Sequence, residues 1–189
     1  MQMQMKATVT IVVAFVATLV LSGCASSMNK GSSHSGQNLT KSDVETAQRE
    51  WGEGIVAISR VHREGGDYSA RAQQHVATLY AYGQTDVMFK PTLAAEDQFR
   101  ENSEEALSYF IGRAGTEDSG FAIKGWTKVR WENNAIYTDS DSAMAMGNYY
   151  FTGPDGKETK VEYTFGYVRD KNGKLKINLH HSSLPFDPE

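Results

Sequence analysis

Residues 142–182 read SAMAMGNYYFTGPDGKETKVEYTFGYVRDKNGKLKINLHHS, and this stretch decides the fold class. It is rich in Val, Ile, Tyr, Phe and Thr, the residues that are enriched in strands. Two turn sequences interrupt it, GPDG at 153–156 and DKNG at 170–173. The stretch therefore predicts strands over 142–152, 160–169 and 174–182. Because the turns are short, neighbouring strands are expected to be antiparallel.

The segment just before this stretch adds one similar strand, and farther upstream the apolar residues recur at helical spacing. The expected elements are helices over 42–64, 68–80 and 103–111 and strands over 86–89 and 128–137. Helices that precede a meander predict an α+β fold, in which a curved antiparallel sheet of about four to six strands packs on N-terminal helices. Ser42 and Glu45 are spaced as a capping box for the first helix. Gly52 and Gly54 interrupt that helix, which indicates either close packing or room for a ligand.

The first residues have the parts of a secretion signal. Lys6 precedes an apolar run over 9–21 that is shorter than the ~20 residues of a membrane span. The run ends in Leu-Ser-Gly-Cys, which matches the lipobox of bacterial lipoproteins, so Cys24 is expected to carry lipid chains. We therefore expect a signal peptide over 1–23, a lipidated and flexible Ser/Gly-rich segment over 24–41 and one domain over 42–189. The expected location is the periplasmic side of the cell envelope, with the outer membrane favoured.

Composition excludes several classes of function. Cys24 is the only cysteine, so the chain has no intramolecular disulfide, cysteine-rich metal site or cysteine nucleophile. The formal net charge is −4 and no basic patch is present, so nucleic acid is not an expected partner. The sequence also lacks the nucleophile elbow of serine hydrolases, a P-loop and a dinucleotide fingerprint.

Candidate catalytic residues lie near the C-terminus and after the strand predicted over 86–89. His180 and His181 are adjacent on a predicted strand, so they point to opposite faces and are badly placed to share a metal ion. Alternation instead pairs His181 with Ser183 on one face and His180 with Ser182 on the other, and one pair should face the hollow between sheet and helices. Two further hydroxyl groups are Thr92, which follows Lys-Pro, and Tyr109, which lies in the third helix. Taken alone, Thr92 has the position of a turn residue and Tyr109 that of a packing residue.

Several motifs together resemble the iota-class carbonic anhydrases. They are Trp51-Gly52-x-Gly54-Ile55-Val56, Leu79-Tyr80-x-Tyr82-Gly83, Val87-Met88-Phe89-Lys90-Pro91-Thr92, Phe99-Arg100, Tyr109-Phe110-Ile111-Gly112 and His180-His181-Ser182-Ser183. More distantly, the chain is similar to the association domains of calmodulin-dependent kinases and to SnoaL-like proteins. These families share a cone-shaped α+β fold and are usually dimeric.

The resemblance implies reversible hydration of carbon dioxide to bicarbonate, without a metal cofactor, by a homodimer. It assigns Thr92, Tyr109, His181 and Ser183 as catalytic residues, with His181 and Ser183 favoured as the pair that faces the pocket. His180 and Ser182 are further candidates for substrate binding. The family often has a third histidine where this chain has Leu179, which weakens a metal site further, although a metal stays an alternative.

The chemistry of the reaction agrees with such residues. Bicarbonate is a small anion that hydroxyl and imidazole donors can bind. Without a metal, a general base must take the proton of the attacking water, and His181 is the candidate. We expect an apolar wall for carbon dioxide from Met144, Phe165, Val87 or Phe89. The alternatives are a non-catalytic envelope lipoprotein that binds small ligands or scaffolds a complex, and a different lyase, isomerase or dehydratase on the same fold.

Overall fold

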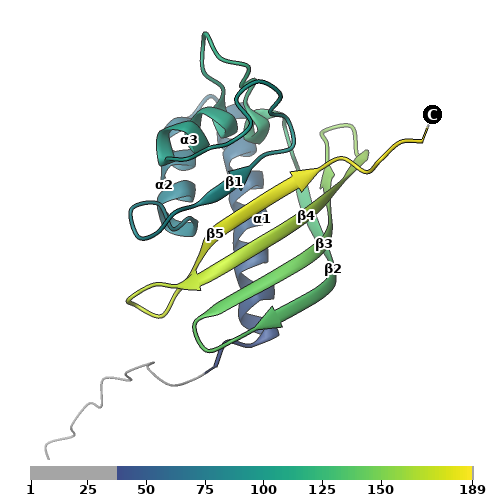
Figure 1. Ribbon diagram of the computed structural model, residues 1–189. Helices are drawn as coiled ribbons and strands as arrows, with labels where there is room; N and C mark the ends of the chain where they lie inside the picture. The colour runs from purple at the N-terminus through teal and green to yellow at the C-terminus, as the bar shows by residue number, and fades with distance from the viewer. Residues whose placement is uncertain (1–37, 189) are drawn as a thin grey trace, which may run out of the picture. The chain divides into compact units, whose positions relative to one another are not determined.

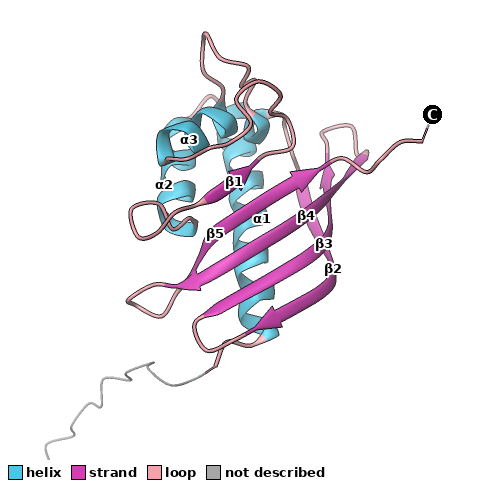
Figure 2. Ribbon diagram, viewed as in Figure 1, coloured by secondary structure: helices cyan, strands magenta, loops and turns pink. Residues whose placement is uncertain are grey.

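A computed structural model describes residues 38–188 of the chain. The predicted signal peptide, Cys24 and the linker up to residue 37 lie outside the described residues. The described part consists of α1 (Lys41–Arg63), α2 (Tyr68–Leu79), β1 (Met88–Lys90), α3 (Ser103–Ile111), the 3-10 helix η1 (Phe121–Ile123), β2 (Lys128–Thr138), β3 (Ser142–Thr152), β4 (Glu158–Arg169) and β5 (Leu175–Ser183). Helices precede a sheet on which they pack, so the expected α+β class is confirmed (Figure 2).

The strands form one open sheet in the order β1-β5-β4-β3-β2. The strands from β2 to β5 make an antiparallel meander, as expected, but β1 pairs in parallel with β5 at the edge. The sheet is therefore mixed rather than wholly antiparallel. Local turn signals could not reveal the direction of β1, because α3 and three strands intervene between β1 and its partner.

The helices cover one face of the sheet, which we call the inner face, and leave the opposite outer face open. In Figure 1, α1 runs behind the sheet, and α2 and α3 lie beside β1. Trp51 of α1 is fully buried against this inner face, with its ring centroid 5.7 Å from that of Phe165 and 5.8 Å from that of Tyr149. Aromatic pairs at these separations stabilise a core beyond the area that they bury. Trp51 thus joins the first helix to the centre of the sheet.

The start of α1 differs from the predicted capping box. Thr40 is the N-cap, and its hydroxyl accepts from the Asp43 N–H at 3.3 Å while the Asp43 carboxylate accepts from the Thr40 N–H at 2.8 Å. The predicted pair Ser42 and Glu45 was therefore wrong. Leu39 is already buried and donates its N–H to the Asp139 carbonyl at 3.1 Å, so the packed part of the chain begins before Ser42.

Both interior glycines of α1 meet packed side chains. A Cβ at Gly52 would lie 3.0 Å from the Cβ of Val129, and one at Gly54 would overlap the ring of His75. Of the two explanations, close packing therefore accounts for both glycines. None of the helices between residues 38 and 188 has the length and apolar character that crossing a membrane requires.

Candidate functional site

A β-bulge in β5 decides which residues of this strand face the helices. Gly166 of β4 pairs with Leu179, but the next residue, Tyr167, pairs with Ile177, so Asn178 is an extra residue in β5. A one-residue shift of this kind moves every following side chain to the opposite face. Ile177 is buried before the bulge, and His180 and Ser182 are buried after it.

His180 and Ser182 therefore lie on the inner face, with only 3% and 2% of their surfaces exposed. His181 is exposed on the outer face, where the hydroxyl of Ser183 donates to the Glu162 carboxylate at 3.1 Å. The preference for His181 and Ser183 as the pocket-facing pair was wrong in orientation. It also leaves His181 badly placed as the general base of an inner pocket.

A chain of hydrogen bonds surrounds His180. The indole Nε1–H of Trp51 donates to the Tyr80 hydroxyl at 3.0 Å, and this hydroxyl lies 2.8 Å from Nδ1 of His180. On the other side of the ring, Nε2 lies 2.9 Å from the Ser182 hydroxyl, which is also hydrogen-bonded to the hydroxyl of Tyr149. We call Tyr80, Tyr149, His180 and Ser182 the inner polar cluster.

Aromatic rings enclose the imidazole of His180. Phe89, its neighbour on β1, stacks on it with ring centroids 4.4 Å apart. Phe165, its neighbour on β4, lies with its ring centroid 4.1 Å from that of His180. Burial among these rings, with smaller contributions from the charges of His75 and His181, holds the pKa of His180 well below its usual value. His180 is therefore neutral at physiological pH. Burial also raises the pKa of the Tyr80 and Tyr149 hydroxyls, so both stay protonated.

Of the expected apolar wall, Phe89 and Phe165 lie beside the cluster. Met144 is 53% exposed on the sheet, so its assignment to the inner wall was wrong. Val87 is buried but lines a groove on the outer side.

Tyr109 links the inner polar cluster to the loop that carries Thr92. Tyr109 is buried, and burial raises the pKa of its hydroxyl while the nearby backbone N–H groups of Leu93 and Thr92 oppose that shift. The same hydroxyl is close enough to Tyr80 and Tyr149 to raise their pKa. Thr92 is half-buried and follows β1, which runs beside β5. The structure thus places Tyr109 between Thr92 and the cluster.

Two consecutive acidic residues hold the loop after Thr92. The Glu117 carboxylate accepts from the backbone N–H groups of Ala95, Glu96 and Asp97, with shortest distances of 2.9, 3.2 and 3.0 Å. These bonds, led by the one from Ala95, lower the pKa of Glu117.

The second acid, Asp118, lies in a buried ion pair. One carboxylate oxygen is 2.6 Å from Nη2 of Arg100, and the other accepts from the Ser108 hydroxyl at 2.6 Å. Arg100 also donates to the Asp97 carbonyl at 2.5 Å, and its guanidinium lies 5.8 Å from the centroid of the Tyr109 ring. The loop of Thr92 and the helix of Tyr109 are therefore joined through Glu117 and Asp118.

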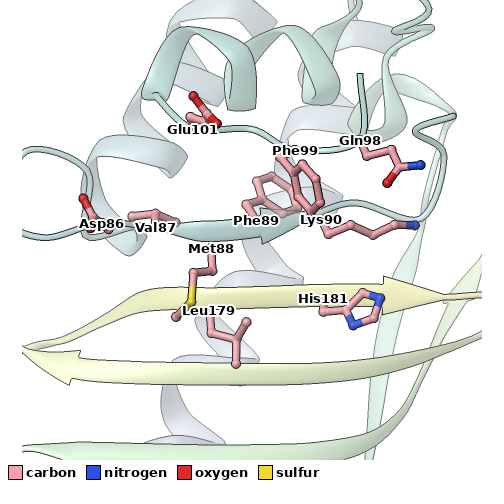
Figure 3. Close-up of a pocket in the computed structure, with 10 residues that line it drawn as sticks. All are labelled: Asp86, Val87, Met88, Phe89, Lys90, Gln98, Phe99, Glu101, Leu179 and His181. Atoms are coloured by element: carbon pink, nitrogen blue, oxygen red, sulfur yellow. The ribbon is translucent and has the colours of Figure 1, made fainter. Parts of the chain in front are cut away.

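A groove of about 850 Å³ runs along the β1–β5 edge, and Phe89, which stacks on His180, is among the residues that line it. Figure 3 shows His181 and Leu179 projecting on this side with Met88 and Phe99. Within residues 38–188, no group of three or more His, Cys, Asp or Glu side chains could hold a metal ion. The inner polar cluster itself offers one imidazole and three hydroxyl groups, which suit a small anion better than a cation.

Sequence reasoning missed three members of this arrangement. Trp51, Tyr80 and Tyr149 had no assigned role, although Trp51 and Tyr80 stand in the motifs quoted above. In the sequence, each resembles an ordinary core aromatic residue, because the polar atom of a buried ring is recognised only through its hydrogen-bond partner. The spacing of 100 residues between Tyr80 and His180 leaves no local signal.

Comparison with known proteins places this geometry in context. A family model described as metal-independent carbonic anhydrase matches residues 42–184. A metal-independent carbonic anhydrase from Nostoc sp. (strain PCC 7120 / SAG 25.82 / UTEX 2576) is 38% identical over 197 residues, which cover 94% of this chain and 96% of that protein.

Two solved structures agree with the fold. The iota-carbonic anhydrase from a cyanobacterium, complexed with bicarbonate, is 40% identical with a TM-score of 0.77, over 80% of this chain and 95% of that chain. A protein from Xanthomonas campestris that is assigned to the calcium/calmodulin dependent protein kinase II association domains is 25% identical with a TM-score of 0.53, over 78% of this chain and 87% of that chain.

Proposed function

The chain belongs to the metal-independent carbonic anhydrase family, and from this membership we propose that its reaction takes place at the inner polar cluster together with Thr92 and Tyr109. The chain is a carbonic anhydrase that interconverts carbon dioxide and bicarbonate without a metal ion. Membership of an enzyme family favours this function over the alternative of a non-catalytic binding or scaffolding lipoprotein. The resemblance read from the sequence is thereby confirmed.

One observation carries the choice of site. The hydroxyl of Ser182 is buried and bonded to both Nε2 of His180 and the Tyr149 hydroxyl, between the rings of Phe89 and Phe165. Apolar rings suit carbon dioxide, and fixed hydroxyl and imidazole groups suit the oxygens of bicarbonate. Donors that are already oriented stabilise the charge that develops on carbon dioxide as water attacks. The complex of the cyanobacterial relative with bicarbonate supports the same ligand class here.

The roles follow from position. Ser182 and His180 lie on the sheet side of the site, whereas Thr92 and Tyr109 come from the loop after β1 and from α3. In this arrangement Ser182 replaces Ser183 and His180 replaces His181 as the site residues of β5. Closure of the site from both sides depends on the contact between Tyr109 and the backbone at Thr92.

The adjacent serines give a matched test. We expect Ser182→Ala to lower the rate of carbon dioxide hydration by about 10²–10³, the effect of removing one oriented donor from an anion site. Ser183→Ala, on the outer face, should hydrate carbon dioxide at the wild-type rate. Both variants are assayed by stopped flow in the presence of a chelator. A Ser182→Ala enzyme that is as fast as wild type would place the reaction elsewhere.

We also propose that the protein is tethered to the periplasmic side of the cell envelope, with the outer membrane favoured, through lipid chains on Cys24. The support is the Leu-Ser-Gly-Cys motif after an apolar run. Mass spectrometry of the purified protein should find a cleaved and acylated Cys24. The variant Cys24→Ser should leave the membrane fraction, and a variant that stays there would contradict the anchor.

A homodimer formed through the outer face is the last part of the proposal. Met144 and Met146 of β3 are 53% and 49% exposed there, and Met88 is 57% exposed beside the groove. Exposed apolar side chains on one face of a sheet favour a protein partner. Light scattering should give the mass of two chains for wild type and one for Met144→Glu/Met146→Glu. A monomeric wild type would overturn this part.

A further inference from the structure

The donors and acceptors around His180 limit which atom donates in each of its hydrogen bonds. The indole of Trp51 can only donate, so the Tyr80 oxygen accepts a hydrogen bond at 3.0 Å. The Tyr80 hydroxyl has one hydrogen of its own, and within residues 38–188 its other polar neighbour is Nδ1 of His180, at 2.8 Å. If this hydrogen is not given to Nδ1, it is buried without an acceptor.

The state of His180 limits the alternatives. Its ring is buried between Phe89, which stacks on it, and the tilted ring of Phe165, so it is neutral and carries one N–H. With the proton on Nδ1, the imidazole and Trp51 would both donate to the Tyr80 oxygen, and the hydrogen of Tyr80 would be left without an acceptor. With the proton on Nε2, the hydrogens of Trp51, Tyr80, His180 and Tyr149 all have acceptors, and the one left over is that of Ser182, which the proposed site turns to the substrate. Buried donors are seldom left unpaired in folded proteins.

We propose that Tyr80 is a positioning residue, which donates to Nδ1 and thereby holds His180 in the tautomer that carries its proton on Nε2. The bond that one ring nitrogen makes decides the state of the other. Nε2 then donates to the Ser182 oxygen at 2.9 Å. Both the choice of tautomer and its catalytic consequence rest on the proposed function, in which an oxygen of the substrate accepts the hydrogen of Ser182.

This polarity makes His180 a donor within an anion site rather than the base that removes a proton from water. Because the Ser182 oxygen accepts from Nε2 and from the Tyr149 hydroxyl, the serine hydrogen is free to point to an oxygen of the substrate. The sheet side of the site then presents the Ser182 hydroxyl as a hydrogen-bond donor to carbon dioxide and bicarbonate. Together with the hydroxyls of Thr92 and Tyr109, this donor recognises a small anion with several acceptor oxygens.

Nitrogen NMR of the histidine-labelled protein tests the tautomer directly. A protonated ring nitrogen and an unprotonated one resonate in separate regions of the ¹⁵N spectrum, and the signals of His180 are identified by their loss in His180→Gln. We expect a protonated Nε2 and an unprotonated Nδ1 at neutral pH. A proton on Nδ1 would overturn the proposal and leave the assignment of Ser182 to the site unaffected.

Two tyrosine variants test the role of Tyr80. In Tyr80→Phe, the Nδ1 resonance should move to the position of a ring nitrogen that accepts no hydrogen bond, and the rate of carbon dioxide hydration should fall several-fold. Tyr82→Phe is the matched control, because Tyr82 stacks on Tyr80 with centroids 5.9 Å apart but donates its hydroxyl to the Arg100 carbonyl. An unchanged Nδ1 resonance in Tyr80→Phe, or an equal change in both variants, would overturn the proposal.

Two tryptophan variants separate the effect of the hydrogen bond to Tyr80 from the effect of packing. Trp51→Phe removes the donor to Tyr80, so the Nδ1 resonance should move in the same direction as in Tyr80→Phe but less far. Trp131 also packs on Trp51, with centroids 5.8 Å apart, yet its buried Nε1 has no hydrogen-bond partner in the described part of the chain. Trp131→Phe should therefore leave Nδ1 where it is. Equal shifts in both tryptophan variants would reduce the effect to packing and contradict the proposed polarity.

Discussion

The imidazole of His75 occupies the space that a side chain at position 54 would need. An ideal Cβ on Gly54 would lie 2.1 Å from Nδ1 and 2.6 Å from Cε1 of His75. His75 is 2% exposed and its ring also contacts Trp51 and Phe110, so it has nowhere to move. The close approach of α1 and α2 therefore depends on a glycine at this position.

Replacing Gly54 with alanine should destabilise the fold. Overpacking in a closed core usually costs about 1–3 kcal/mol in the free energy of unfolding, and the helix propensity of alanine returns only ~1 kcal/mol of that. Urea denaturation measures the change. The effect should be non-additive with His75→Ala, because the smaller side chain makes room for the methyl group. Purely additive effects of the two substitutions would show that His75 is not the obstacle.

As the pH is lowered, the stability of the protein should begin to fall before its carboxylates are protonated. Burial, with a smaller contribution from the charge of Arg71, lowers the pKa of His75 from 6.5 to about 3, and the pKa of His180 is also lowered. The unfolded chain binds these protons below pH 6.5 and the folded chain does not. The stabilisation is therefore complete above pH 6.5 and is lost as the pH falls toward the folded pKa.

The variant His75→Gln should reduce this dependence. Each proton taken up on unfolding contributes about 1 kcal/mol per pH unit to the slope of the free energy of unfolding between about pH 5 and 6. Denaturation curves at several pH values would give a smaller slope for the variant than for wild type. Equal slopes would mean that His75 is protonated in the folded protein.

The carboxylate of Glu117 should control the mobility of the loop that carries Thr92. In Glu117→Gln, the amides of Ala95, Glu96 and Asp97 should exchange faster with deuterium, and kcat/KM should fall because Thr92 is held less firmly. In wild type, the lowered pKa of Glu117 means that this protection is present above the usual value of 4.5 and is lost as the pH falls through the lower folded value.

The matched control for Glu117→Gln is Glu96→Gln. It neutralises a carboxylate in the same loop but leaves the backbone N–H of Glu96 in place. Exchange rates and kcat/KM of this control should match those of wild type. If both variants behave alike, charge near the loop would matter rather than the three hydrogen bonds.

The buried ion pair between Arg100 and Asp118 should be costly to break. The two side chains are 2% and 5% exposed, and Asp118→Ala would leave the Arg100 charge buried without its partner. Loss of one partner from a buried pair costs about 3–5 kcal/mol in the free energy of unfolding. Glu158→Ala, which breaks the more exposed pair with Arg130, should leave urea denaturation almost unchanged. A small effect of Asp118→Ala would show that water reaches Arg100.

The elements that the sequence predicted well are those with strong local signals. The third helix was predicted over 103–111 and found at Ser103–Ile111, and the strand predicted over 142–152 was found at Ser142–Thr152. Period, caps and turn residues all act within a few positions of the chain, so they can be read without the fold. The capping box of α1 was misplaced because Thr40-Lys41-Ser42-Asp43 offers two candidate caps within one turn.

Interactions between distant segments could not be predicted in this way. The parallel pairing of β1 with β5, the ion pair of Arg100 with Asp118 and the bonding of Tyr80 to His180 each depend on where the chain returns. Thr92 and Tyr109 were chosen through a family resemblance, and the structure shows what joins them. Trp51 and Tyr149 had the hydrophobic signature of a core, which concealed their polar contacts.

The sequence by itself determined that His180 and His181 point to opposite faces, because successive side chains alternate along a strand. It could not determine which face is the inner one, since each face carries one histidine and one serine and so shows no contrast in hydrophobicity. Only the tertiary structure decided this. The extra residue Asn178 shifts β5 by one position against β4, so that His180 and Ser182, rather than His181 and Ser183, meet Tyr80 and Tyr149.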